Sequence, residues 1–274
     1  MELKHCLERV RSTTPLIHNI TNYVTVNDVA NALLACGASP IMADDAEEAE
    51  DITAICGGLN INIGTLNQRT IPAMLLAGKR AAELGHPTVL DPVGAGASPL
   101  RTGTAARLME EIPFTVIRGN ISEIKTLARG AGTTRGVDAD VADAVTEDNL
   151  AQAVAFAKSF AAAHHCVAVI TGAIDLVADG EQCYVIRNGR PEMGGITGTG
   201  CQLSGLIAAY VTANPDRALE GAAAAVCLMG YAGEVAWGRM EPGDGNATYR
   251  SRIIDAICHM TGDALQAGAK LELR

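Results

Sequence analysis

The chain has 274 residues, enough to bury the core of one large α/β domain, and we expect a single domain over residues 1–274. Hydrophobic residues make up 48% of the sequence but aromatic residues only 3%, so the core must consist mainly of small aliphatic side chains, as in a sheet covered by helices. The formal net charge of -10 argues against nucleic acid or an anionic membrane as a partner.

The cysteines and the N-terminal residues indicate the compartment. The eight cysteines are widely spaced, without a C-x-x-C motif or a Cys/His pair at metal-site spacing, so we expect mostly buried thiols in a reducing compartment. Residues 1–15 carry charges and no apolar stretch of signal-peptide length, which predicts a cytoplasmic protein. The longest uncharged run, residues 193–215, opens with glycines among polar residues, and we interpret it as a loop leading into a buried helix rather than a membrane span.

Short apolar runs alternate with helical patterns along the chain, which predicts parallel strands joined by crossover helices. The expected strands are residues 38–42, 59–63, 88–90, 114–117 and 167–170. The expected helices are residues 24–34, 68–84, 104–111, 122–127, 148–163, 201–212, 218–237 and 249–266. The apolar runs 174–178 and 183–186 predict an antiparallel extension at one sheet edge. Residues 129–143 have the composition of a surface loop.

Polar and glycine-rich residues directly after the predicted strands are the candidate site residues, because ligands of open α/β sheets bind beyond the carboxyl ends of the strands. The strongest candidate segment is Gly198-Thr199-Gly200, which precedes an apolar helical pattern. Backbone N–H groups and the helix dipole converge there on an anion such as a phosphoryl group. Cys201 would lie in the first helical turn, where the same field favours a thiolate that accepts a proton from an attacking hydroxyl. The alternative is a tight turn followed by a small buried cysteine.

Two carboxylates also follow predicted strands: Asp91 directly, and Glu123 at the start of the next helix. Near a polyphosphate such carboxylates can hold Mg²⁺, directly or through its water ligands. Asp91 could equally cap the loop before Pro92, and Glu123 could complete a capping box with Asn120. The pattern of residues leaves both interpretations open.

Four further residues have a functional and a structural interpretation. Arg118 could bind a phosphate or lie on the surface, and Thr171 could contact a nucleotide or turn the chain. Asn22 belongs to an amide-rich segment that either recognises a small polar acceptor or caps the helix expected near Val24, and its spacing favours the cap. Met42 ends a predicted strand and is more often a core residue than part of a ligand pocket.

Six segments carry a family resemblance: residues 15–24 (PLIHNITNYV), 39–43 (SPIMA), 59–66 (LNINIGTL), 91–96 (DPVGAG), 118–123 (RGNISE) and 197–201 (TGTGC). Together they resemble the hydroxyethylthiazole kinases, the thiamin-salvage branch of the ribokinase-like family. The HNITN segment and the cysteine are specific to this branch, because most ribokinase-like kinases carry Asp at the position of Cys201. One departure is residues 243–249 (GDGNATY), where the family usually shows Gly-Pro-Gly-Ser/Thr-Phe. This departure affects how the following helix starts and how residues pack beside the nucleotide, but not the reaction.

The resemblance implies a ribokinase-like α/β fold, with a central, mostly parallel sheet and helices on both faces. It also implies that ATP and Mg²⁺ are used to phosphorylate 4-methyl-5-(2-hydroxyethyl)thiazole, in a homotrimer with active sites between subunits. By position, the implied site residues are Met42, Gly198 and Asn22 for the thiazole, Arg118, Thr171 and Gly200 for ATP, Asp91 and Glu123 for the metal, and Cys201 as the catalytic base.

Three other functions remain to be weighed against this one. Another ribokinase-like kinase would act on hydroxymethylpyrimidine or pyridoxal, but Cys201 and the N-terminal amides favour the thiazole. An ADP- or ATP-dependent hydro-lyase on the same scaffold would release water instead of forming a phosphate ester. A catalytically silent binding protein would keep the pocket, and the presence of Asp91, Glu123 and the glycine loop argues against it.

Overall fold

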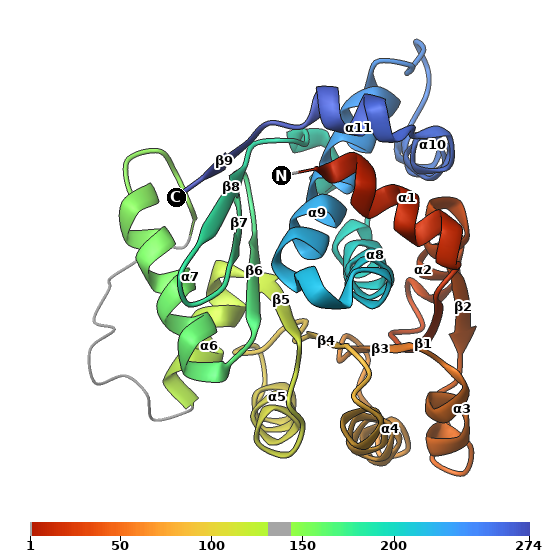
Figure 1. Ribbon diagram of the computed structural model, residues 1–274, viewed down its shortest axis with the longest axis vertical. Coiled ribbons are helices and arrows are strands. Elements are labelled where there is room, and N and C mark those ends of the chain that lie inside the picture. Colours follow the sequence, from red (N-terminus) through yellow and green to blue (C-terminus); the bar gives the residue numbers. More distant parts are fainter. Residues whose placement is uncertain (1, 131–143) are drawn as a thin grey trace.

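Figure 1 shows the computed structural model of the chain, which describes residues 2–130 and 144–274. Within these residues one continuous sheet of nine strands runs through the molecule. In spatial order the strands are β2 (Ser39–Met42), β1 (Leu16–Ile20), β3 (Gly58–Asn62), β4 (Thr88–Asp91), β5 (Val116–Asn120), β6 (Val167–Thr171), β7 (Asp175–Ala178), β8 (Cys183–Ile186) and β9 (Leu271–Leu273). Strands β2 through β6 in this order are parallel, and β7, β8 and β9 add an antiparallel edge.

Helices cover both faces of the sheet (Figure 1). One face is covered by α1 (Leu3–Thr13), α2 (Val26–Cys36), α8 (Thr199–Ala213) and α9 (Ala218–Trp237), with α10 (Asn246–His259) and α11 (Gly262–Gly268) packed outside them. The other face is covered by α3 (Ala49–Ile55), α4 (Thr70–Leu84), α5 (Pro99–Glu111), α6 (Ile121–Gly130) and α7 (Leu150–His164). The predicted fold, with a mostly parallel sheet and helices on both faces, is therefore confirmed.

Successive strand residues fill two separate cores. Val116 of β5 packs into the core with α8 and α9, whereas Ile117 packs into the core with α4 to α7. Neighbouring side chains of a strand point to opposite faces, so a strand buried on both sides is apolar throughout instead of alternating. This is why the strands were recognisable as continuous apolar runs.

The long apolar helices belong to the interior of the fold. Residues 193–215 form the end of a short 3-10 helix, η1 (Pro191–Gly195), and then the buried helix α8, as predicted. In the described part of the chain, one stretch, Pro215–Trp237, is long and apolar enough to cross a membrane. Of its most apolar part, 72% is buried inside the fold. Seven cysteines are buried and Cys258 is exposed, in line with the expectation for most of them.

Several element predictions were incomplete. Strands β1 and β9 and helices α1 and α3 were not predicted. The single helix expected at residues 249–266 is two helices, because Met260 is extended and the Thr261 side chain accepts a hydrogen bond from Ala264 N at the start of α11. Of the loop expected at residues 129–143, residues 129 and 130 end α6 and the remainder lies outside the described residues.

Candidate active site

The carboxyl ends of six parallel strands meet at one edge of the sheet. Met42 pairs with Asn19, Asn62 with Asp91, and Asn120 with Thr171 in the strand registers. Helix α2 joins β1 to β2 on one face of the sheet, and α3 joins β2 to β3 on the other face. The order of strands therefore reverses between β1 and β3. A crevice forms at such a reversal.

Helix α8 begins over this edge with Gly198 in a left-handed conformation. Its φ is 89°, and a Cβ at this position would lie 2.4 Å from Thr25 Cγ2, so both the backbone conformation and the packing require glycine. Residues Thr199 to Cys201 form the first turn, whose N–H groups have no partner inside the helix. These N–H groups and the helix dipole favour an anion at this end of α8.

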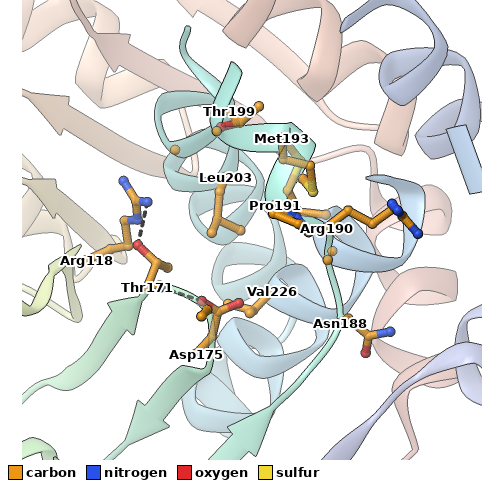
Figure 2. Close-up of a pocket in the computed structure, with 17 residues that line it drawn as sticks. Arg118, Thr171, Asp175, Asn188, Arg190, Pro191, Met193, Thr199, Leu203 and Val226 are labelled. Carbon is orange, nitrogen blue, oxygen red and sulfur yellow. Dashed lines mark hydrogen bonds between the residues drawn. The ribbon is translucent and has the colours of Figure 1, made fainter. Parts of the chain in front are cut away.

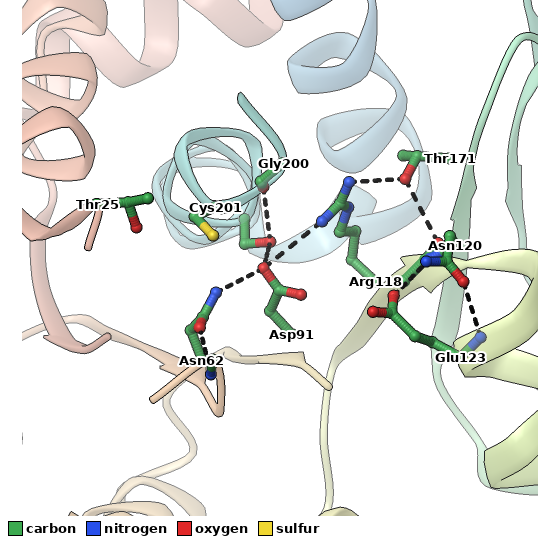
Figure 3. Close-up of polar contacts among 12 residues, drawn as sticks. Thr25, Asn62, Asp91, Arg118, Asn120, Glu123, Thr171, Gly200 and Cys201 are labelled. Atoms are coloured by element: carbon green, nitrogen blue, oxygen red, sulfur yellow. Dashed lines mark hydrogen bonds and ion pairs between the residues drawn. The ribbon is translucent and has the colours of Figure 1, made fainter. Parts of the chain in front are cut away.

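Arg118 of β5 brings a positive charge to the same end of α8 (Figure 3). Its Nη2 donates a hydrogen bond of 2.7 Å to Thr171 Oγ1, and Nη1 lies 3.6 Å from Asp91 Oδ2. A Cβ at Gly200 would lie only 2.6 Å from Nη1, so glycine at this position lets the guanidinium approach the helix. The dipole and the guanidinium together favour an anion at this point, although Asp91 balances part of the positive charge.

Asp91 is fully buried at the end of β4, and only one of its carboxylate oxygens accepts hydrogen bonds. Oδ2 accepts hydrogen bonds of 2.8 Å from Asn62 Nδ2 and from Ser204 Oγ, whereas Oδ1 is buried and has no hydrogen-bond partner. Burial raises the pKa of Asp91 to about 6, and the nearby Arg118 charge and the two hydrogen bonds limit this rise. The carboxyl group therefore offers one free acceptor oxygen to a cation or a donor.

Glu123 forms the capping box that the sequence offered as an alternative. Its Oε2 accepts from Asn120 N and its own N donates to Asn120 Oδ1, both at 2.8 Å, while Oε1 accepts from Gly94 N at 2.8 Å. Each carboxylate oxygen keeps a lone pair beyond these bonds. Among the residues described, three or more His, Cys, Asp or Glu side chains nowhere form a group able to hold a metal by themselves.

Asn22 contacts Cys201 and also fixes the segment before α2. Its Nδ2 lies 3.2 Å from Cys201 Sγ and donates a 3.0 Å hydrogen bond to Asn62 Oδ1. Its Oδ1 accepts from Thr25 N and Thr25 Oγ1, at 3.1 and 3.0 Å. Asn22 therefore holds a turn before α2 and does not cap the helix itself, because Thr25 precedes the first helical residue, Val26.

A cavity of about 560 Å³ lies beside the start of α8 (Figure 2). Arg118, Thr171 and Gly200 line its polar end, and Leu203 and Val226 belong to an apolar wall. This volume lies within the usual range for small-molecule and cofactor sites. A cavity with a cationic end and an apolar wall suits a nucleotide, which has a polyphosphate at one end and a flat base at the other.

Met42 lines a second cavity, of about 220 Å³, on the other side of the Asn22 segment. Asn19, Thr21, Tyr23 and Met74 also line it. Asn22, which lies between Thr21 and Tyr23 in the chain, does not line this cavity and contacts Cys201. The predicted thiazole residue Met42 is thus in a different cavity from the predicted ATP residues.

The model for the hydroxyethylthiazole kinase family matches residues 7–263. This chain belongs to that family. A hydroxyethylthiazole kinase from Clostridium acetobutylicum is 60% identical over 270 residues, which cover 98% of this chain and 99% of the relative. The resemblance inferred from the six segments is therefore confirmed.

Solved structures support the same assignment. The structure of a hydroxyethylthiazole kinase from Pyrococcus horikoshii has a TM-score of 0.88 and 32% identity, covering 99% of this chain and 98% of that one. A pyridoxal kinase from Staphylococcus aureus has a TM-score of 0.56 and 16% identity, covering 79% and 86% of the two chains, and shares the fold alone. The ribokinase-like fold expected for a member of the hydroxyethylthiazole kinase family is confirmed.

Three polar residues of the candidate site were not singled out from the sequence: Asn62, Ser204 and Asp175. Asn62 and Ser204 both bind Asp91, and Asp175 lines the larger cavity and accepts a 2.8 Å hydrogen bond from Gly172 N. The presence of two Asn residues, Asn60 and Asn62, in the buried strand β3 was a usable signal, although it does not distinguish one from the other. Ser204 lies one helical turn after Gly200, but its contact with β4 depends on the packing of α8 on the sheet.

Proposed function

We propose that this chain uses ATP to phosphorylate the hydroxyl group of 4-methyl-5-(2-hydroxyethyl)thiazole, in the salvage of thiamin. The family assignment supports the reaction, and the start of α8 supports the site. The observation that carries the proposal is that Arg118, Asp91 and Cys201 converge at the N-terminus of α8, beside a cavity of nucleotide size. We assign the reaction to the cytoplasm, because buried free thiols suit a reducing compartment.

ATP would occupy the larger cavity with its phosphates toward α8. Arg118 and Thr171 are joined by a short hydrogen bond at the polar end, and both belong to the cavity wall. Gly200 contributes backbone at the same point, so its N–H group is available to a phosphate oxygen. The apolar wall formed by residues such as Leu203 and Val226 would receive the base.

Asp91 and Glu123 fit a role in holding Mg²⁺ with the phosphates of ATP. Asp91 Oδ1 is a buried acceptor without a partner, and an oxygen of this kind is suited to Mg²⁺ or one of its water ligands. Glu123 is fixed by backbone N–H groups at the neighbouring strand end. When bound, Mg²⁺ would neutralise charge on the transferred phosphoryl group. Two carboxylates without a third ligand suit a metal that reaches the site with its nucleotide.

Cys201 is assigned as the base that accepts the hydroxyl proton. Asn22 donates toward Sγ at 3.2 Å, so sulfur acts as the acceptor in this contact. The substrate oxygen would attack the γ-phosphorus in line with the leaving oxygen, while the first-turn N–H groups of α8 and Arg118 stabilise the developing charge. Cys201 assists by removing the proton, and most of the catalysis is positioning and electrostatic stabilisation.

The thiazole would bind next to the Asn22 segment, with Met42, Gly198 and Asn22 as its contacts. The cavity lined by Met42 also includes Tyr23, which is 77% exposed, and the next residue, Val24, is 59% exposed. Two adjacent exposed apolar side chains, one of which lines the cavity, suit contact with a neighbouring subunit. We therefore propose a homotrimer whose active sites lie between subunits.

The reaction is tested by measuring ATP consumption with Mg²⁺ and the thiazole alcohol, with hydroxymethylpyrimidine and pyridoxal in parallel and products identified by mass. A phosphate ester that forms only with the thiazole supports the proposal. Preferential turnover of another alcohol would assign a different substrate. Loss of water from a substrate would indicate a hydro-lyase, and nucleotide binding without turnover would indicate a binding protein.

A further inference from the structure

Asn62 connects the two sides of the candidate active site. It is the last residue of β3, is 1% exposed, and uses both ends of its amide group. Its Nδ2 donates to Asp91 Oδ2 at 2.8 Å, and its Oδ1 accepts from Asn22 Nδ2 at 3.0 Å. Because Asn22 also contacts Cys201, a continuous chain of buried polar contacts runs from the cysteine sulfur to the carboxylate.

Backbone N–H groups fix the orientation of both amides. Gly64 N donates to Asn62 Oδ1 at 2.9 Å, so the NH₂ group of Asn62 must face Asp91. Thr25 N donates to Asn22 Oδ1 at 3.1 Å, so the NH₂ group of Asn22 must face Asn62 and Cys201. A flip of either amide would place its NH₂ group against a backbone N–H donor and its oxygen against an acceptor, and would lose several hydrogen bonds at once. The direction of the chain is therefore set by the fold.

This orientation determines which atoms remain free for chemistry. Asn62 and Ser204 hold Oδ2 of Asp91, which leaves Oδ1 as the oxygen without a partner. At the other end, Asn62 holds the amide that touches Cys201 Sγ. A buried side chain supported by such contacts keeps the geometry needed by the groups that meet the substrate.

We propose that Asn62 is a positioning residue that couples the carboxylate of Asp91 to the thiol of Cys201 through Asn22. Asn62 touches neither substrate in this assignment. Its Nδ2 holds Oδ2 of Asp91, which leaves Oδ1 without a partner. Its Oδ1 holds the Asn22 amide so that an N–H of Asn22 points to the sulfur of Cys201. The inference rests on the proposed kinase reaction and adds a residue to it.

The test compares Asn62→Ala with Asn60→Ala. Asn60 is a matched control, because it is a fully buried asparagine of the same strand and donates to Asn19 Oδ1 instead of Asp91. Asn62→Ala should lower kcat about 10- to 100-fold, the usual cost of losing a residue that orients a site ligand, with KM for the alcohol changed less than about threefold. Asn60→Ala should keep kcat within about threefold of the wild-type value.

A binding measurement without the alcohol gives a readout that does not depend on turnover. The dissociation constant of ATP is measured by calorimetry with and without Mg²⁺. In Asn62→Ala the gain in ATP affinity on adding Mg²⁺ should shrink by about threefold or more, and in Asn60→Ala it should stay as in the wild type. Thermal unfolding confirms that the variants are folded, and Asn62→Ser replaces Asn62→Ala if the alanine variant does not fold.

A double variant tests the contact with the cysteine. If Asn62 acts partly through Asn22 and Cys201, its substitution should cost less in a Cys201→Ala background than in the wild type. The proposal is overturned if the Asn62 and Asn60 variants behave alike or if only KM changes. It is also overturned if substitution of Asn62 lowers kcat by the same factor in the wild-type and Cys201→Ala backgrounds. Absence of turnover in the wild type would instead refute the kinase reaction, and the calorimetric comparison would still decide the role of Asn62.

Discussion

The guanidinium of Arg118 lies against the backbone of Gly200, where an added Cβ would come within 2.6 Å of Nη1 and 2.7 Å of Nη2. The same guanidinium donates to Thr171 and lies 3.6 Å from Asp91 Oδ2. Its position is thus limited on one side by β4 and β6 and on the other by the first turn of α8. A residue with a side chain at position 200 cannot coexist with this arrangement.

Gly200→Ala should therefore displace Arg118 and weaken ATP binding. We expect KM for ATP to rise about tenfold or more, because a charged contact to phosphate is worth about 1.5–3 kcal/mol. KM for the alcohol should change less. The matched control is Gly195→Ala in the same glycine-rich segment, since a Cβ at Gly195 would meet no atom within 4 Å. Equal effects of the two substitutions on KM for ATP would show that Arg118 does not depend on the close approach.

Cys201→Ala should reduce turnover and leave ATP binding largely intact. Loss of a general base typically lowers the rate about 10²- to 10⁴-fold. The control is Cys36→Ala, which removes another buried thiol, that of α2, where Sγ donates to Leu33 O. Rate measurements at saturating substrate and calorimetry with ATP give the two quantities. A Cys201→Ala enzyme with normal turnover would remove the cysteine from the mechanism.

The sequence predicted the parts of the site that depend on local chemistry. A glycine segment before an apolar helix was enough to locate the start of α8, and an Asn followed three residues later by Glu was enough to offer the capping box of Asn120 and Glu123. Asn62 was not found, because its role depends on the register that places β3 next to β4 and Asn62 opposite Asp91. Register is a long-range property that residue spacing does not contain.

Strand β1 shows how tertiary contacts can override a local pattern. His18 and Asn19 interrupt the apolar run of this unpredicted strand, yet both side chains are buried in the sheet. The His18 ring forms hydrogen bonds with Thr53 Oγ1 and Ala43 O, at 2.9 and 2.8 Å. Asn19 Nδ2 donates to Ile17 O, and Asn19 Oδ1 accepts from Asn60 Nδ2. Partners from elsewhere in the chain satisfy these polar groups, so the strand tolerates them.

Val24→Asp should disrupt the proposed trimer. Val24 is 59% exposed and follows Tyr23 at the mouth of the smaller cavity, so a charge placed there would be buried without a partner in an interface. The control is Leu100→Asp on α5, which replaces another exposed apolar residue, 55% exposed, on the other side of the sheet. Light scattering should report a trimer for the wild type and Leu100→Asp, and a smaller species for Val24→Asp. A wild-type monomer, or a trimer in all three proteins, would contradict this interface.

Asp175→Asn should stabilise the protein at high pH but not at low pH. Burial raises the pKa of Asp175 from 3.8 to about 7, although the Gly172 N–H bond and the Arg118 charge oppose the rise. The folded state therefore keeps a proton that the unfolded state has released between about pH 4 and pH 7, and the stability contributed by this group falls as the pH rises through that window. Asparagine has no charge to bury and can still accept from Gly172 N through its Oδ1.

The expected result is a Tm for Asp175→Asn about 2–4 °C above that of the wild type at pH 8, the change that roughly 1 kcal/mol gives in a chain of this size. The difference should shrink toward zero near pH 4, where the wild-type carboxyl group is neutral in the folded state. Asp179→Asn is the matched control, because Asp179 accepts two backbone N–H bonds in the turn of the same hairpin. A Tm difference for Asp175→Asn that does not change with pH would mean that hydrogen bonding, rather than the cost of burying the charge, governs this position.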